Sequence, residues 1–324
     1  MYLRTYICYC PGMKRVEHKR LAAGFLILLA ALCFAPSCLA QDIEPRRWTH
    51  LPTGMHVMGV GLSNRSGDIL LDPVLLAEDV TFDLYGTGLS YVHSFNLAGK
   101  SARVDVILPY ASGRWEGLVD GVYTSVRRRG LADARVRFSM NLYGAPALKG
   151  KEFLEYRARN QTNTTIGTAM AISVPTGDYN NQWLINLGSN RWIFRPQLGV
   201  LHQRKKWQFE MTGSVSIFGD NDDFWQGTER KQDPLWFLQG HVIYSFKPGL
   251  WAGLSAGFAH GGRSTVSDVP KLDDSRTPYM AASFGTSIGK KQGLKLAYIR
   301  IRTNIDIGTD QDIFLLGWSY RWAR

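Results

Sequence analysis

The sequence predicts an all-β protein: an up-and-down antiparallel transmembrane β-barrel of about 12 strands that follows a cleaved N-terminal signal peptide. Three observations lead to this fold class. Apolar and polar residues alternate with a period of two through most of the chain after residue 40, and helical periodicity is almost absent. Short and long connections alternate between these runs, and the last run carries a ladder of aromatic residues.

The first 40 residues have the layout of an export signal. A basic stretch, MKRVEHKR at 13–20, precedes the apolar run LAAGFLILLAALCFA at 21–35, and a small-residue cleavage site ends at Ala40. The apolar run is shorter than the roughly 20 residues that cross a membrane as a helix. We therefore predict a signal peptide at 1–40, with Met13 as a second candidate start, and a barrel domain at 41–324. A retained N-terminal anchor is the alternative.

All four cysteines lie inside this predicted signal peptide. The mature chain would therefore have no thiol for a disulfide or for a Cys-ligated metal. No cofactor or metal site is expected, because the sequence contains no phosphate loop, dinucleotide fingerprint or HExxH motif. The net charge is +11, but it comes with no basic helix or nucleic-acid motif, so no nucleic-acid partner is expected.

The alternation predicts the positions of the strands. WQFEMTGSVSI at 207–217 is the clearest example, with Trp, Phe, Met, Gly, Val and Ile on one face and polar residues on the other. A change of phase near Tyr298 would need a bulge. The predicted strands are 55–63, 84–97, 101–110, 131–143, 164–174, 190–202, 207–218, 235–246, 250–260, 279–289, 293–302 and 312–322.

The lengths of the connections indicate how these strands are arranged. Short connections lie at 97–100, 203–206, 247–249 and 289–293, and long polar ones at 64–83, 111–130, 175–189, 219–234, 261–278 and 303–311. Regular alternation places all tight turns at one end of an up-and-down sheet, as in outer-membrane barrels. The stretch 144–163 is the exception, since it is long where a short turn is expected.

A soluble sandwich or lipocalin-like barrel would show the same alternation with the opposite face inward. The polar phase, however, is rich in Gly, Ser, Thr and Gln, whereas a soluble exterior would carry more Lys and Glu. Trp and Tyr also gather at strand ends, where an amphipathic ring suits a membrane interface. The predicted interface aromatics are Trp192, Trp207, Trp236, Tyr279, Trp318, Tyr320 and Trp322.

The chain ends with FLLGWSYRWAR at 314–324, in which large apolar groups occupy every second position. In a membrane barrel this face contacts lipid and the small residues face the lumen. A final strand with alternating aromatics is also the kind of signal that barrel-assembly machinery recognises. We therefore expect the lipid bilayer of a bacterial outer membrane and this machinery as partners.

The stretch 171–200, AISVPTGDYNNQWLINLGSNRWIFRPQLGV, resembles outer-membrane proteins grouped as the MetA-pathway phenol-degradation, or transporter, family. The matching pieces are VPTGDY at 174–179, NLGSNRW at 186–192 and PQLGV at 196–200, and the spacing of later strands continues the likeness. The resemblance implies an outer-membrane β-barrel with a role in transport. It brings no catalytic residues to this chain.

An outer-membrane barrel enzyme of the lipase or protease type is the main competing hypothesis. A lipase-like barrel needs a Ser–His pair, and His93 and Ser94 are adjacent, but neighbours in a strand point to opposite faces. The acidic loops 218–225 and 269–276 offer Asp side chains that could hold Ca²⁺ at the cell surface, or simply remain solvated. A barrel with a structural or adhesive role is a further alternative.

The remaining candidate site is the lumen. Under the assigned phase it is lined by Arg103, Asp105, Arg135, Arg137, Arg195, Gln197, Glu210, His241, Lys295 and Arg321. These charges would either pair into networks that brace the barrel or form a basic pore lining that favours anions. The sequence thus predicts a non-enzymatic channel for passive uptake of small solutes, aromatic or anionic, through a narrow lumen.

Overall fold

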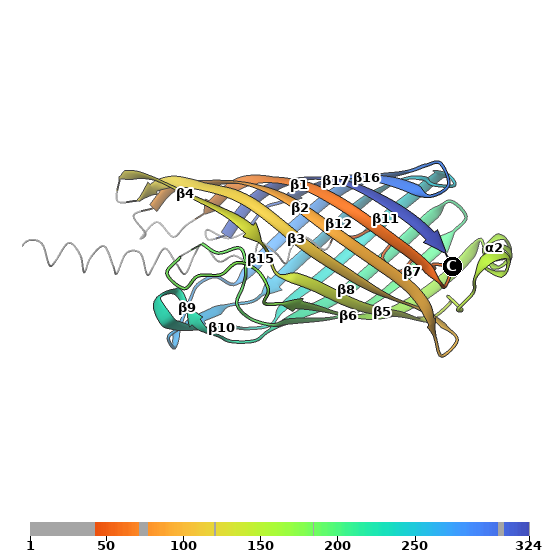
Figure 1. Ribbon diagram of the computed structural model, residues 1–324, viewed down its shortest axis with the longest axis horizontal. Coiled ribbons are helices and arrows are strands. Elements are labelled where there is room, and N and C mark those ends of the chain that lie inside the picture. Colours follow the sequence, from red (N-terminus) through yellow and green to blue (C-terminus); the bar gives the residue numbers. More distant parts are fainter. Residues whose placement is uncertain (1–42, 71–76, 120, 184, 304–307, 324) are drawn as a thin grey trace, which may run out of the picture.

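The computed structural model describes residues 43–70, 77–119, 121–183, 185–303 and 308–323, and these form a closed β-barrel (Figure 1). Within this part of the chain the twelve wall strands are β1 (Met55–Leu70), β2 (Ala77–Leu97), β3 (Lys100–Val119), β5 (Ala134–Tyr143), β6 (Thr162–Val174), β7 (Ile193–Arg204), β8 (Trp207–Phe218), β11 (Leu235–Lys247), β12 (Leu250–Gly261), β15 (Ser275–Ile288), β16 (Gln292–Ile301) and β17 (Gly308–Ala323). The wall closes where β1 pairs with β17 along its full length. The predicted fold class is confirmed. The predicted signal peptide lies outside the described residues.

One end of the barrel carries the tight turns and is called the turn end. It includes the connections at 97–100, 204–207, 247–250 and 288–292. Lys205 and Gly249 have positive φ values of 53° and 84°, which lets the chain reverse within a few residues. The C-terminus lies at this end (Figure 1), and the long connections meet at the opposite end, called the loop end. The predicted alternation of connections is therefore observed.

The connection that broke the predicted rhythm contains a helix. α2 (Gly150–Arg159) lies at the turn end between β5 and β6. Its only buried side chain is Phe153, while Glu155 is within 3.6 Å of Lys151 and 3.9 Å of Arg159. A ten-residue helix with one buried residue has almost no apolar periodicity, which is why the sequence did not reveal it.

Further strands, here called the cap, lie at the loop end (Figure 1). β4 (Val122–Leu131) continues the wall by pairing with the outer half of β3. A separate sheet consists of β9 (Asn221–Phe224), β10 (Thr228–Gln232), β13 (Ser264–Val266) and β14 (Val269–Pro270), with the short helix η1 (Trp225–Gly227) between its first two strands. Phe224 and Trp225 are buried against Val266 in its core. Several predicted loops are thus strands, because pairing continues where both faces are polar and the alternation is lost.

Apolar side chains cover the outer face of the wall. On β17, Phe314, Leu316 and Trp318 are 57%, 43% and 39% exposed, whereas Ile313 on the other face is 1% exposed. Large apolar groups at this level of exposure fit lipid contact and would be costly in water. No helix in the described part of the chain is long and apolar enough to cross a membrane.

Six of the seven predicted interface aromatics lie on this outer face near the strand ends. Trp192, Trp207, Trp236 and Trp318 are exposed, and Tyr320 lies 6.0 Å from Trp322. Tyr279 does not, and its prediction is wrong. It is 4% exposed and points into the barrel, where its ring lies against Gly257, a residue with no side chain to exclude it. Apolar residues occupy both faces of this part of β15, so alternation could not assign the side.

The predicted bulge in β16 is also absent. The register with β15 is unbroken from Tyr279↔Ile301 to Ile288↔Gln292. Tyr298 points outward against Phe314, and Ile299 and Ile301 point inward into an apolar cluster. The apparent change of phase arises because the inward face of this strand changes from Lys295 to Ile299 and Ile301, while the outward face ends on Arg300.

We predict that Leu316→Arg lowers the free energy of unfolding by about 2–4 kcal/mol, because a charge on the lipid face of a mid-wall strand must leave water. Urea titration of the protein folded in lipid vesicles measures this. Leu272→Arg is the matched control, because Leu272 is 73% exposed in the loop-end cap. Equal stabilities of the two variants would contradict lipid contact at Leu316.

Candidate functional site

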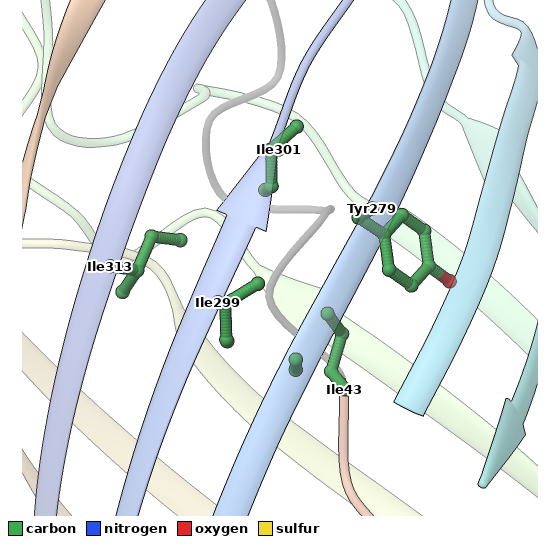
Figure 2. Packing of buried hydrophobic residues seen from close by; sticks show 6 residues of the cluster. Ile43, Tyr279, Ile299, Ile301 and Ile313 are labelled. Carbon is green, nitrogen blue, oxygen red and sulfur yellow. The ribbon is translucent and has the colours of Figure 1, made fainter. Parts of the chain in front are cut away.

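A stretch of chain ahead of β1 lies inside the barrel. Residues 43–54, here called the lumen segment, run through the interior to the turn end, where β1 begins. Ile43 packs in an apolar cluster with residues of β15, β16 and β17, and Figure 2 shows it beside Ile299 and Tyr279. Arg47 is 6% exposed and Trp48 only 1%. The barrel interior is therefore occupied by residues of the same chain.

Trp48 fits a recess in the wall. Gly167 and Gly199 pair directly across β6 and β7, and a Cβ atom at either position would overlap the indole ring. The indole N–H donates a 2.8 Å hydrogen bond to Thr212 Oγ1 on the next strand. Two adjacent inward glycines thus form a flat seat for one large side chain, and this seat holds the middle of the lumen segment.

An ionic network fixes the lumen segment to the wall. Arg47 Nη1 lies 2.8 Å from Asp105 Oδ2, and the same oxygen accepts from Arg137 Nε at 3.1 Å. Arg137 Nη2 in turn lies 2.7 Å from Glu44 Oε2. The Arg47 side chain also donates to Ser139, and its backbone N–H donates to Glu210 Oε1 at 2.9 Å. The segment therefore supplies partners to charges that the wall buries.

The turn end clamps the other end of the segment. His50 is hydrogen-bonded to the Pro146 carbonyl at 2.7 Å, and its ring contacts Phe153 and Tyr156 of α2 edge-on, at centroid distances of 4.9 and 5.5 Å. The Thr53 N–H donates to the Leu148 carbonyl at 2.8 Å. The β5–β6 connection therefore acts as a bracket around the point where the segment leaves the barrel.

The loop-end half of the lumen contains a cavity of about 420 Å³. Its walls are mainly apolar and include Phe82, Leu84, Trp115 and Phe218. Its charged lining residues are Arg65, Asp133, Arg191, Arg230 and Lys295. This volume lies in the range of roughly 300–1,000 Å³ that is typical of small-molecule pockets.

The turn-end half contains a more open vestibule of about 770 Å³. Arg46, Arg157, Lys295 and Arg321 line it together with Glu44 as the one carboxylate among its described lining residues. The Arg46 guanidinium lies 5.3 Å from the ring centre of Trp251. A concave surface with this charge balance attracts anions.

The two spaces share one strip of wall. Gly61, Gly88, Lys295, Leu315 and Gly317 line both of them. Gly61 pairs with Gly88 on one side and with Gly317 on the other, and Gly317 pairs with Lys295. This row, here called the glycine row, runs across β2, β1 and β17 and offers no bulky side chain. The glycine row is therefore the part of the wall that the two spaces have in common.

The structure places the ten predicted lumen residues on the inner face of the wall. Asp105, Arg137 and Glu210 belong to the ionic network, with Arg103 Nε 3.5 Å from Asp105 Oδ1. Lys295 and Arg321 line the vestibule. The others are buried or half-buried inward residues away from both spaces: Arg135, Arg195, Gln197 and His241. Four of the ten thus belong to the ionic network, and two line a lumen space.

Sequence reasoning missed the lumen segment. Glu44, Arg47 and Trp48 lie in a stretch without strand alternation, directly after the predicted cleavage site. One signal in the stretch EPRRWTHLP (44–52) could have indicated the lumen segment. A Trp flanked by charged and polar residues does not fit the lipid-facing side of a strand.

The residues considered for catalysis are far from a catalytic arrangement. Ser94 is fully buried and donates to the Pro52 carbonyl at 2.5 Å, whereas His93 lies on the opposite face of β2 and stacks on His56 at 4.3 Å. The acidic loops are engaged within the cap. Asp274 pairs with Arg263 at 2.6 Å, and Asp273 accepts from the Ser264 N–H at 2.8 Å.

The two glycine-containing motifs of 174–192 meet at the junction of β4 and β5. Asp133 accepts from the Gly177 N–H at 3.0 Å and from the Ser189 N–H at 2.9 Å. Asp178 accepts from the Leu131 N–H at 3.1 Å. Gly177 and Gly188 approach so closely that a Cβ on either would collide with the other. These contacts hold the loop 175–192 against the wall beyond the end of β6. The loop lines the loop-end cavity with residues 185–189 and Arg191.

A family model described as "Putative MetA-pathway of phenol degradation" matches residues 63–322. No curated protein matches the chain. Among solved structures, a COG4313 outer membrane channel from Pseudomonas putida F1 is similar with a TM-score of 0.72 at 20% identity, covering 87% of this chain and all of that one. A Pseudomonas aeruginosa FadL homologue has a TM-score of 0.43 at 10% identity, covering 82% and 90% of the two chains.

We predict that Trp48→Ala loosens the lumen segment and exposes Arg46 and Arg47 to trypsin, because the mutation removes the indole contact with its glycine seat and the bond to Thr212. Mass spectrometry of peptides released from the folded barrel detects the cut, which is absent in the wild type. Trp183→Ala, in an exposed loop-end position, is the control. Continued protection of Arg46–Arg47 in the Trp48 variant would show that the seat does not hold the segment.

Proposed function

The chain belongs to the MetA-pathway phenol-degradation family, and from this membership and its occupied lumen we propose that it is a passive outer-membrane channel for small aromatic or anionic solutes. The observation that carries the proposal is the pair of lumen spaces that share one strip of wall, beside a segment held to that wall by non-covalent contacts. In this view the loop end faces the exterior, the turn end faces the periplasm, and lipid surrounds the apolar outer face.

The lumen segment is the gate of the proposed channel. Within its ionic network, Arg47 and Glu44 come from the segment, and Arg103, Arg137, Asp105 and Glu210 come from the wall. Each side contains equal numbers of cationic and anionic groups. Withdrawal of the segment therefore leaves no net charge stranded in this part of the wall, which lowers the electrostatic cost of opening.

The route follows the glycine row. A solute that enters the loop-end cavity passes Gly88, Gly61 and Gly317 and reaches the basic vestibule near Lys295. The driving force is the concentration difference, and no nucleotide or metal takes part. The apolar cavity suits an aromatic body, and the excess of cationic groups in both spaces suits an anion.

We predict that Gly199→Val opens the channel. The new side chain occupies the seat of Trp48 and displaces the lumen segment, while the strand itself tolerates a β-branched residue. Single-channel recordings in planar bilayers should show a conductance several times that of the wild type. Gly213→Val is the control, since Gly213 lies on the same sheet with open space around it. Equal currents from the two variants would contradict a gating role for the segment.

We predict that Lys295→Glu, made in the Gly199→Val background, shifts ion preference toward cations. Lys295 lines both lumen spaces, so a reversed charge acts at the point every permeating ion must pass. Reversal potentials under a salt gradient measure the change, and Lys247→Glu, at the exposed turn end of β11, serves as the control. An unaltered reversal potential would place the ion path elsewhere.

A further inference from the structure

The loop-end cavity has the features of a specific binding site. Apolar side chains form most of its wall, from β2, β3, β8 and the loop that follows β6: Phe82, Leu84, Trp115, Ile185, Leu187 and Phe218. A cavity of about 420 Å³ with such walls accepts a single aromatic ring together with a substituent. What distinguishes one such solute from another is the polar group at its edge.

Arg191 lines this cavity with an incompletely bonded guanidinium. The residue is 6% exposed, and its guanidinium lies 4.6 Å from the ring centre of Phe218. Nη2 donates to the Gln232 side chain, but Nη1 has no hydrogen-bond partner among the described residues. A buried cationic donor without an acceptor is costly, so such a group generally has a ligand or counter-ion to receive it.

The nearby acids do not fill this role. Asp133 lines the same cavity, but its two oxygens accept from Gly177 and Ser189 of the loop. Burial, and then the positive charge of Arg230, lower the pKa of Arg191 to about 9, although Asp220 and Asp133 act in the opposite direction. The positive charge at Arg191 is therefore undercompensated within the protein.

Taking the proposed channel function as given, we propose that the loop-end cavity selects small aromatic carboxylates, with the ring among the apolar walls and the carboxylate on Arg191. A carboxylate offers the acceptor that Nη1 lacks, and the charge-assisted bond between the two is stronger than a neutral one. Nη1 is covered by its neighbours, so a rotation of the terminal bonds of the side chain brings it to the ligand.

Other solute classes fit less well. A neutral aromatic compound fills the apolar walls but leaves Nη1 without an acceptor. A small inorganic anion satisfies Arg191 but leaves the apolar cavity to water. The backbone next to Arg191 is held in place, because Ser189, two residues earlier, is bonded to Asp133, and Asn190 is bonded to Asn221 at 2.8 Å. A cation beside an apolar cavity discriminates by charge as well as by shape.

The test compares benzoate with benzyl alcohol, which share the ring and differ in charge. Isothermal titration calorimetry on the full-length protein, folded in detergent at pH 7, should give benzoate at least about tenfold higher affinity than the alcohol. Arg191→Gln should abolish this preference with little effect on the alcohol. Arg204→Gln, at the exposed turn end of β7, should leave both affinities unchanged. Equal wild-type affinities for the two compounds, or a preference that survives Arg191→Gln, would overturn the proposal.

Two further measurements keep the outcome decisive. If Arg191→Gln fails to give the heat-modifiable band of a folded barrel, Arg191→Met, which keeps an apolar stem and removes the charge, replaces it. Loss of the preference supports the proposal, and an unchanged preference overturns it. Flux of both compounds through the Gly199→Val variant in vesicles tests carboxylate selection and channel function separately. If both compounds pass, and neither flux nor binding distinguishes them, carboxylate selection alone is refuted. If benzoate binds selectively but neither compound passes, the channel function is refuted and the binding site remains supported.

Discussion

The structure depends on one constraint: a β-sheet in hydrocarbon must close, because an open edge would leave backbone groups without partners. The twelve described wall strands meet this constraint through the full-length pairing of β1 with β17. Closure at this strand number creates an interior that wall side chains alone do not fill, since about eight strands is the size at which they can. The lumen segment occupies that interior, and the position of every candidate functional residue follows from it.

The contacts of the lumen segment determine which part of the barrel wall it covers and which part lines the lumen spaces. Trp48 and the ionic network bind it to the β3–β8 side of the barrel, and His50 fixes its exit at the turn end. The strip of wall where the glycine row crosses β2, β1 and β17 borders both lumen spaces. Glycine therefore has two uses in this barrel. At Gly167 and Gly199 it admits a plug side chain, and along the row it leaves a path.

The two sequence motifs of the loop 175–192 have a structural explanation. PTGDY and NLGSNRW lie on either side of a loop that returns to the wall at Asp133, and the close approach of Gly177 to Gly188 allows this return. The result is that Arg191 is carried to the edge of the apolar cavity. Residues that brace the wall and residues that meet a solute are thus joined in one loop.

The sequence by itself determined the barrel, its strand positions, the end that carries the tight turns and the inward phase of residues such as Asp105 and Glu210. These follow from alternation and connection length, which are local properties of a strand. Only the tertiary structure decided the side taken by Tyr279, the helix α2 and the location of residues 43–54 inside the barrel. A side chain between two apolar faces takes its direction from strand register, and a segment without regular structure is placed only by the distant residues that receive it.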